Sequence, residues 1–326
     1  MMVADVEPRG RLTQVDGLLV GHWTDTEGIT GCTVVLCEEP FVCAADVRGG
    51  APGTRETDLL APGRLVERVD AIVLAGGSAY GLAAADGVVA WLRDQGRGFP
   101  TKAGPVPIVP AAIIYDLWLG KPSWPGAQAG YFAAASASAD FTCGSVGAGT
   151  GATVGKFLGE ERATKAGVGT ACLAGVGGLV VGALAVVNAL GNVVEPESGR
   201  VVAGARLEDG TFASARLLYT IERGWSHSMN TTLVVVGTNA ALSRSEAYRV
   251  AQMAQDGLAL AVRPAHTLYD GDTTFCVATG KLQADPNLVG IMAVEVVAAA
   301  IVHAASSAGS LGGIPAARDV RGVQPA

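Results

Sequence analysis

Apolar residues along this chain form two kinds of run. Uninterrupted runs predict strands that are buried on both faces, and runs with helical spacing predict helices. Turn-forming residues separate the strand-like runs from one another. These runs are residues 12–45 (LTQVDGLLVGHWTD, GCTVVLC and FVCAADV), 71–77 (AIVLAGG), 107–120, 200–205, 211–217, TLVVVGTNA and TTFCVATGKL.

Three segments predict helices. Residues 78–96 are Ala-rich and follow a Gly turn, and residues 288–307 are rich in Ala and Val. Residues 243–262 begin with Ser243 as N-cap and Glu246 three positions on, the arrangement of a capping box. Residues 120–135 are expected to be irregular. Strands in groups with apolar helices between them predict a single layered α/β domain over residues 1–326.

The run from 166 to 194 carries no charge and is long enough to span a bilayer. Glycine recurs throughout it, and Asn188 and Asn192 interrupt its end. Two buried strands joined by a Gly-rich turn explain this run better than a membrane helix.

Composition narrows the class of protein further. Hydrophobic residues make up 49% of the 326 residues and charged residues 16%, which is ample for a core. The net charge of −7, with no basic cluster, argues against nucleic-acid or anionic-membrane partners. Six cysteines without a CxxC pair predict reduced thiols, and the N-terminal MMVADVEPRGRL lacks an apolar h-region, so we expect a cytoplasmic protein.

Several familiar sites are excluded by spacing. GSVGAGTGATVGKF (144–157) fails as a phosphate loop because Thr150 replaces a required Gly and Phe157 replaces the Mg²⁺-binding Ser or Thr. No dinucleotide-binding pattern or GxSxG elbow is present. The four histidines are scattered without metal-ligand spacing, so no cofactor or metal is expected.

The segment HSMNTTLVVVGTNA (227–240) offers a nucleophile that needs no histidine. A Thr at a new N-terminus can use its own α-amino group, with a pKa near 7.7 to 8.0, as general base. Thr231 could attack the Asn230 carbonyl and cut the chain itself. Taken alone, Asn230-Thr231-Thr232 is better explained as the polar start of a strand.

Four other positions could contribute to such a site. Asp270 and Asp272, in the turn DGDTTF, could hydrogen-bond the nucleophile and its ammonium, or they could simply favour a turn. Lys156 could stabilise a neighbouring charge or lie on the surface. Asn188, at the end of a buried run, has a side-chain amide suited to an oxyanion, or it ends a strand. Tyr115, at the end of AAIIYD, could serve likewise or lie at the core edge.

Together these segments resemble the DmpA-type aminopeptidase family, which includes L-aminopeptidase/D-alanine esterase, β-peptidyl aminopeptidases and the nylon-oligomer hydrolase NylC. The resemblance runs in order from about residue 15 to 310. It rests on DVRGGAPGTRETDLL, LAGGSAYGLAAADGVVAWL, PIVPAAIIYD, AVVNALG, NTTLVVVGTN and DGDTTF.

The resemblance implies an αββα four-layer sandwich like that of N-terminal nucleophile hydrolases and of ornithine acetyltransferase. It also implies autoprocessing between Asn230 and Thr231 into chains of 230 and 96 residues (1–230 and 231–326), and a homotetramer of these heterodimers. By position, Thr231 resembles the nucleophile. Many peptidase members have Ser there, and the Asn-Thr pair is more similar to the nylon-hydrolase branch.

The remaining positions carry over in the same way. Asp270 and Asp272 match the nylon-hydrolase branch, where β-peptidases carry Ser and Glu. Asn188 resembles the oxyanion-hole Asn, Tyr115 the active-site Tyr, and Lys156 the lysine near the nucleophile. The differences from the peptidase members, at Thr231, Asp270 and Asp272, concern substrate specificity. The implied reaction is still hydrolysis of the amide bond of a short peptide or ω-amino-acyl amide. Two alternatives stay open: an acyltransferase of ornithine-acetyltransferase type, and an uncleaved, non-catalytic scaffold.

Overall fold

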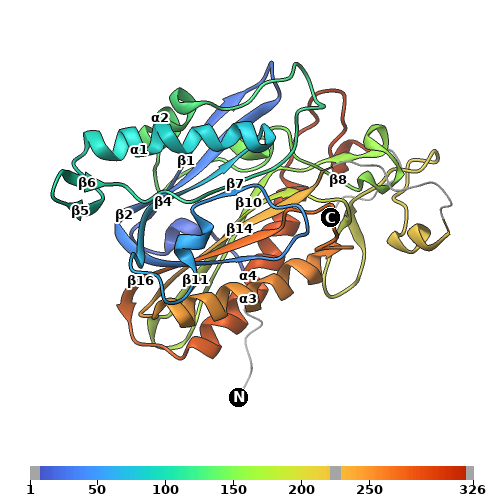
Figure 1. The fold of residues 1–326 in the computed structure, drawn as a ribbon. Coiled ribbons are helices and arrows are strands. Elements are labelled where there is room, and N and C mark those ends of the chain that lie inside the picture. Colours follow the sequence, from blue (N-terminus) through green and yellow to red (C-terminus); the bar gives the residue numbers. More distant parts are fainter. Residues whose placement is uncertain (1–7, 221–228, 321–326) are drawn as a thin grey trace.

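The computed structural model describes residues 8–220 and 229–320 (Figure 1). Two features used above lie outside these ranges. They are residues 1–7, which are part of the N-terminal segment MMVADVEPRGRL, and His227. The Asn230–Thr231 peptide bond lies inside them.

Nine strands form one mixed sheet in the order β10-β11-β14-β16-β2-β4-β7-β3, with β1 paired to β2 beside this path. The pair β14–β16 is parallel, and β14 is antiparallel to β11 on its other side. The strands are β1 Leu18–Asp25, β2 Thr30–Val47, β3 Thr54–Arg55, β4 Arg68–Ala75, β7 Ala111–Ile113, β10 Val168–Ala174, β11 Val180–Asn188, β14 Thr231–Ala240 and β16 Thr273–Leu282.

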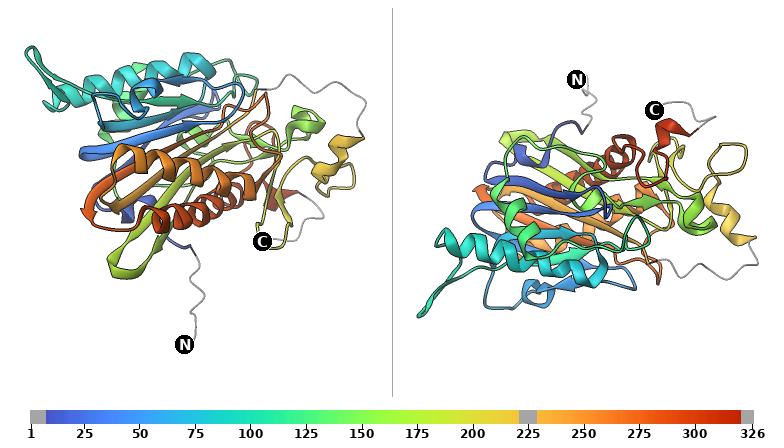
Figure 2. Two further views of the ribbon diagram at one scale, coloured as in Figure 1. Left: turned by 60° about the horizontal axis from the view of Figure 1, so that its bottom comes forward. Right: turned by 90° about the horizontal axis from the view of Figure 1, so that it is seen from above.

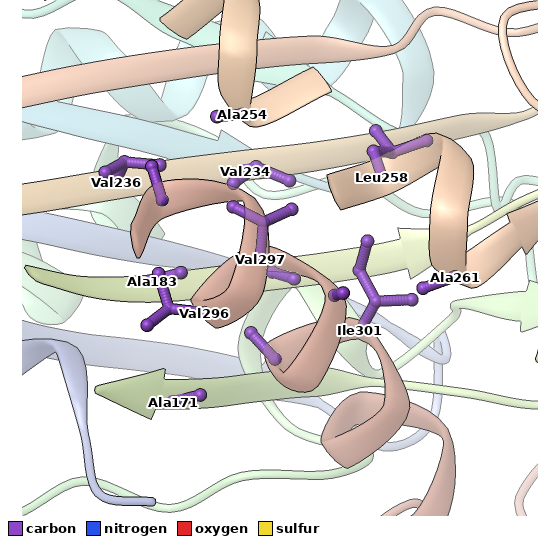
Figure 3. Close-up of a cluster of buried hydrophobic side chains, with 14 of the residues drawn as sticks. Ala171, Ala183, Val234, Val236, Ala254, Leu258, Ala261, Val296, Val297 and Ile301 are labelled. Atoms are coloured by element: carbon purple, nitrogen blue, oxygen red, sulfur yellow. The ribbon is translucent and has the colours of Figure 1, made fainter. Parts of the chain in front are cut away.

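The uninterrupted apolar runs are strands buried on both faces, as predicted. In β14, Leu233 and Val235 point into one hydrophobic core, whereas Val234 and Val236 point into another. The second of these cores lies against α3 (Arg244–Ala261) and α4 (Pro286–Ser306), as Figure 3 shows. Alternate side chains of one strand therefore serve two separate layers.

Strand β2 gives the sheet its layered form. Its first part pairs with β1 and β4, its last part pairs with β16, and the register shifts between Leu36 and Phe41. Side chains of β2 and β4 and of β11, β14 and β16 share one core, so the two parts of the sheet face each other. Helices α1 (Ala84–Asp94) and α2 (Ala127–Ala135) cover the outside of one part, and α3 and α4 cover the other (Figure 2).

This arrangement confirms the predicted αββα sandwich. The two β layers are not separate sheets, because β2 joins them by hydrogen bonds into one.

Helix α2 corrects the prediction that residues 120–135 are irregular. Its composition of Ala and Gly gives little amphipathic pattern, so the sequence carries no clear helical period. The helix is explained by its packing on α1. A Cβ on Gly87 would lie 1.7 Å from the Ala127 carbonyl oxygen, and a Cβ on Gly130 would lie 1.8 Å from that of Ala84. Only glycine permits this approach of the two backbones.

Two predicted strands are shorter than expected. Within 107–120 only β7 pairs, because Pro107 and Pro110 have no N–H to donate to a ladder. Within 211–217, Phe212 forms one isolated bridge, and the chain then turns into a 3₁₀ helix, Ala215–Tyr219, capped by Ser214.

The short strands form three small sheets. Their members are β12 (Asn192–Val194) with β13 (Val201–Ala203) and β15 (Val262–Arg263), β5 (Phe99–Thr101) with β6 (Gly104–Val106), and β8 (Thr153–Val154) with β9 (Thr164–Lys165).

The apolar run 166–194 forms β10 and β11, as predicted, rather than a helix. Within the described residues, α4 is long and apolar enough to cross a membrane by length and composition, but 61% of its most apolar window is buried inside the fold. The six cysteines all have free thiols, which confirms the prediction of reduced cysteines.

Candidate active site

The predicted nucleophile lies where the chain passes from the surface into the centre of the sheet. Met229 is 46% exposed, whereas Asn230 and Thr231 are 1% and 3% exposed. Strand β14 begins at Thr231, which stands opposite Asn188 of β11, and Asn230 forms a bridge with Asp270. The sheet therefore brings together segments that are at least forty residues apart in the sequence.

The carbonyl group of Asn230 receives two hydrogen bonds. The Thr231 hydroxyl donates to this oxygen, and the Gly271 amide donates to it at 2.7 Å. The Asn230 amide in turn donates to the Tyr269 carbonyl at 2.9 Å. A Cβ on Gly271 would lie 2.7 Å from Thr231 Oγ1, so the absence of a side chain leaves room for the hydroxyl. The Asn230–Thr231 peptide bond therefore has one N–H group and one hydroxyl group aimed at its carbonyl oxygen.

The two carboxylates of the DGDT turn have different partners. Asp272 Oδ1 accepts the Thr232 amide at 2.7 Å, and Oδ2 accepts both the amide and Nδ1 of His266 at 2.9 Å. Asp270 Oδ2 accepts the amide and hydroxyl of Thr267 at 2.9 and 2.6 Å. Burial and, to a smaller extent, the nearby Asp272 charge together raise the pKa of Asp270 to about 6.

Lys156 is fully buried beside Asn188. Its Nζ donates to Asn188 Oδ1 at 2.8 Å and to the Asn188 carbonyl at 3.0 Å. Burial lowers the pKa of Lys156 to about 7, while the charges of Asp270 and other carboxylates act in the opposite direction. Asn188 Nδ2 donates to the Tyr115 carbonyl at 3.0 Å, so the hydrogen bond shown for Tyr115 uses its backbone. The predicted residues thus form one connected cluster.

Sequence reasoning did not select three neighbours of this cluster. One is His266. The others are Lys165, which is fully buried, and Asp116, whose Oδ1 accepts the Gly77 amide at 2.6 Å. Burial lowers the pKa of Lys165 to about 7 and raises that of Asp116 to about 6. The Lys165 ammonium donates to three backbone carbonyls, those of Ala152 (2.6 Å), Ala166 (3.1 Å) and Gly149 (3.4 Å).

Thr231, Asn188 and the two aspartates are all buried, none of them more than 3% exposed. Cavities of about 680 and 670 Å³ lie elsewhere, both bordered by Gly10, Thr170 and His303, and neither is lined by a residue of the cluster. Within residues 8–220 and 229–320, no group of three or more His, Cys, Asp or Glu side chains could hold a metal ion.

Comparison with known proteins places this chain in a family. The model of peptidase family S58 matches residues 10–319. The chain belongs to this family. An uncharacterized aminopeptidase of Mycobacterium tuberculosis is 42% identical, covering 95% of this chain and 97% of that protein. The 6-aminohexanoate-oligomer endohydrolase of Kocuria sp. is 29% identical, covering 89% of this chain and 84% of that protein.

Solved structures share the fold. The L-aminopeptidase D-Ala-esterase/amidase of Ochrobactrum anthropi, described as a variant of the Ntn hydrolase fold, has a TM-score of 0.72 at 20% identity over 97% of this chain and 91% of that chain. The β-aminopeptidase of Burkholderia sp. has a TM-score of 0.69 at 22% identity over 100% and 98%. The S58 family chain is therefore a hydrolase of amide or peptide bonds with an Ntn-type fold, as the sequence predicts.

Proposed function

We propose that this hydrolase cuts its own chain between Asn230 and Thr231 and then uses Thr231 as its N-terminal nucleophile. The observation that carries the proposal is the pair of hydrogen bonds on the Asn230 carbonyl, one from the Thr231 hydroxyl and one from the Gly271 amide. The nucleophile and a donor to the developing oxyanion are both in place before any substrate binds.

In the first step Thr231 Oγ1 attacks the carbonyl carbon of Asn230. The C–N bond breaks, the hydroxyl proton passes to the leaving nitrogen, and an ester joins Asn230 to Thr231 Oγ1. Water then hydrolyses the ester, which releases the Asn230 carboxylate and leaves Thr231 with a free α-amino group. The Gly271 amide supports the negative oxygen of each tetrahedral intermediate.

The same groups then act on a substrate amide. The Thr231 amine takes the hydroxyl proton as Oγ1 attacks, and it passes that proton to the leaving amine. Asn188, oriented by Lys156 and by the Tyr115 carbonyl, is the second oxyanion donor through the other hydrogen of its side-chain NH2 group. Asp272 holds the Thr232 amide, which fixes the residue next to the nucleophile.

The proposed substrates are short peptides or oligomers of ω-amino acids. Relatives named as an aminopeptidase and as a 6-aminohexanoate-oligomer endohydrolase support this range. We further propose that the processed heterodimers form a homotetramer, as the family resemblance implies. We also propose that the protein is cytoplasmic, which the free thiols of all six cysteines support.

Denaturing gels and N-terminal sequencing of the purified protein test the cleavage. Wild-type protein and Thr231→Ser should give chains of 230 and 96 residues, and Thr231→Ala should remain intact. The matched control is Thr232→Val, because the Thr232 hydroxyl is buried without a hydrogen-bond partner. An unbroken wild-type chain, or cleavage of Thr231→Ala at the wild-type rate, would contradict the proposal. Activity is then measured on dipeptide amides and on 6-aminohexanoate oligomers.

A further inference from the structure

Two consecutive residues outside the predicted site bind both of its carboxylates. His266 donates its amide and its Nδ1 to Asp272 Oδ2, each at 2.9 Å. Thr267 donates its amide and its hydroxyl to Asp270 Oδ2, at 2.9 and 2.6 Å. Each residue thus contributes one backbone donor and one side-chain donor to one carboxylate. The segment immediately before the DGDT turn fixes the orientation of the pair.

His266 is held in this place at a cost to the fold. Its φ of 57° lies in the left-handed region, which residues other than glycine seldom adopt. Its Nε2 is buried and has no hydrogen-bond partner among the residues that the structure describes. The Asp272 carboxylate is therefore the hydrogen-bond partner that the structure shows for the ring. A residue retained only for packing would need neither the strained backbone nor the unsatisfied nitrogen.

The ring connects to the nucleophile through Asp272. A carboxylate oxygen only accepts, so His266 Nδ1 carries the proton in this bond. Asp272 uses its other oxygen, Oδ1, to accept the Thr232 amide at 2.7 Å. Rotation of the carboxylate would therefore break the hydrogen bond from the Thr232 amide, which anchors the start of β14 next to Thr231. His266, Asp272 and Thr232 form a continuous chain of hydrogen bonds ending beside the hydroxyl that attacks.

We propose that His266 is a positioning residue for the nucleophile, acting through Asp272. This role rests on the proposed function of Thr231. The hydrogen bonds of the His266 side chain do not include Thr231, so the ring transfers no proton in the reaction. It keeps Asp272 turned so that the Thr232 amide, and with it Thr231, stays in line with the carbonyl to be attacked.

Two substitutions separate the side chain from the backbone strain. His266→Gly removes the ring and relieves the left-handed conformation, whereas His266→Asn tolerates that conformation and keeps a side-chain N–H near the position of Nδ1. His303→Asn is the matched control, since His303 is a half-buried histidine that hydrogen-bonds the Thr170 backbone through Nδ1, away from the site.

The rate of cleavage between residues 230 and 231 is the first measurement. His266→Gly should be slower by about 10- to 100-fold, while His266→Asn and His303→Asn should stay within about threefold of wild type. Added imidazole should restore part of the loss in His266→Gly only. After complete processing, the loss in His266→Gly should appear in kcat and leave KM nearly unchanged. Wild-type rates in His266→Gly, or equal losses in the Gly and Asn variants, would overturn the proposal.

A second measurement does not depend on activity. In a Thr231→Ala background, hydrogen exchange of the amides at 229–236 should be faster with His266→Gly than with His266→Asn or with no second change. Unchanged exchange would overturn the positioning role even if the enzyme cleaves itself. Conversely, faster exchange in a protein whose Thr231 proves dispensable would uphold the hydrogen-bond chain and refute the proposed nucleophile.

Discussion

Adding one methyl group at Gly271 should test how closely the hydroxyl of Thr231 must be placed. The backbone at Gly271 is not left-handed, so Gly271→Ala introduces a steric change without conformational strain, and its N–H group remains. The new Cβ would lie 2.7 Å from Thr231 Oγ1 and 2.9 Å from the Ala51 carbonyl oxygen. Ordinary contact begins near 3.4 Å, so the hydroxyl must move by about 0.7 Å or rotate away from the Asn230 carbonyl.

Either response moves the nucleophile out of line. A displacement approaching 1 Å costs on the order of 100-fold in rate, so self-cleavage should slow by about 10- to 100-fold. The overpacked site should also lower the free energy of unfolding by about 1–3 kcal/mol.

Quantitative denaturing gels over a time course, together with thermal unfolding, measure both effects. Gly126→Ala is the matched control, because its added Cβ would meet nothing within 4 Å and its φ is −93°. That variant should cleave at the wild-type rate. If Gly271→Ala also cleaves at that rate, the hydroxyl position described above is not the reactive one, and the reasoning fails.

Three further changes give distinct outcomes. Lys156→Met should slow cleavage by about 10- to 100-fold in the same gel assay, because it removes the hydrogen-bond donor to Asn188. The melting temperature should not fall, because an apolar chain of similar length replaces a buried cation. The free energy of unfolding of Thr231→Ala should rise between pH 7 and 9, because the unfolded lysine (pKa 10.5) keeps its proton there whereas folded Lys156 (pKa about 7) releases it. Denaturant titrations at several pH values measure this rise, which is up to about 1.4 kcal/mol per pH unit for one lysine. The rise per pH unit should be smaller when Lys156→Met is added. Gly130→Ala should destabilise the fold by at least about 1–3 kcal/mol, because its Cβ would lie 1.8 Å from the Ala84 carbonyl oxygen. The cleavage rate of the folded protein should stay unchanged. A slower rate in folded protein would contradict the separation of the α1–α2 layer from the site.

The sequence reveals those parts of the fold whose signal is local. The central parts of β11 (181–187) and β14 (233–236) are apolar at every position, and only a strand between two layers buries both sets of side chains. Ser243 and Glu246 mark the start of α3 by a capping box that the structure contains. Helix α2 was missed because Gly130 and its alanines fit a neighbouring backbone, which no periodicity records.

The candidate site shows the same limit. Thr231, Asn188 and the two aspartates stand at the ends of strands, and their order in the sequence resembles that of a known family. Lys165 was missed because a lysine satisfied by backbone carbonyls has no sequence pattern, and its partners are set by tertiary folding. His266 stands four residues before Asp270, but its bond to Asp272 depends on a left-handed turn that the sequence HTLYDGD does not announce.

The central position of β14 and β16 has a consequence for the cut protein. Cleavage after Asn230 would place both strands, with α3 and α4, on a chain of 96 residues inserted between β11 and β2 of the other chain. The two chains would then share their cores and their sheet hydrogen bonds, so they would stay together without a covalent link. Refolding, however, would change from a reaction within one molecule to an encounter between two, and the apparent stability of the mature enzyme would depend on its concentration.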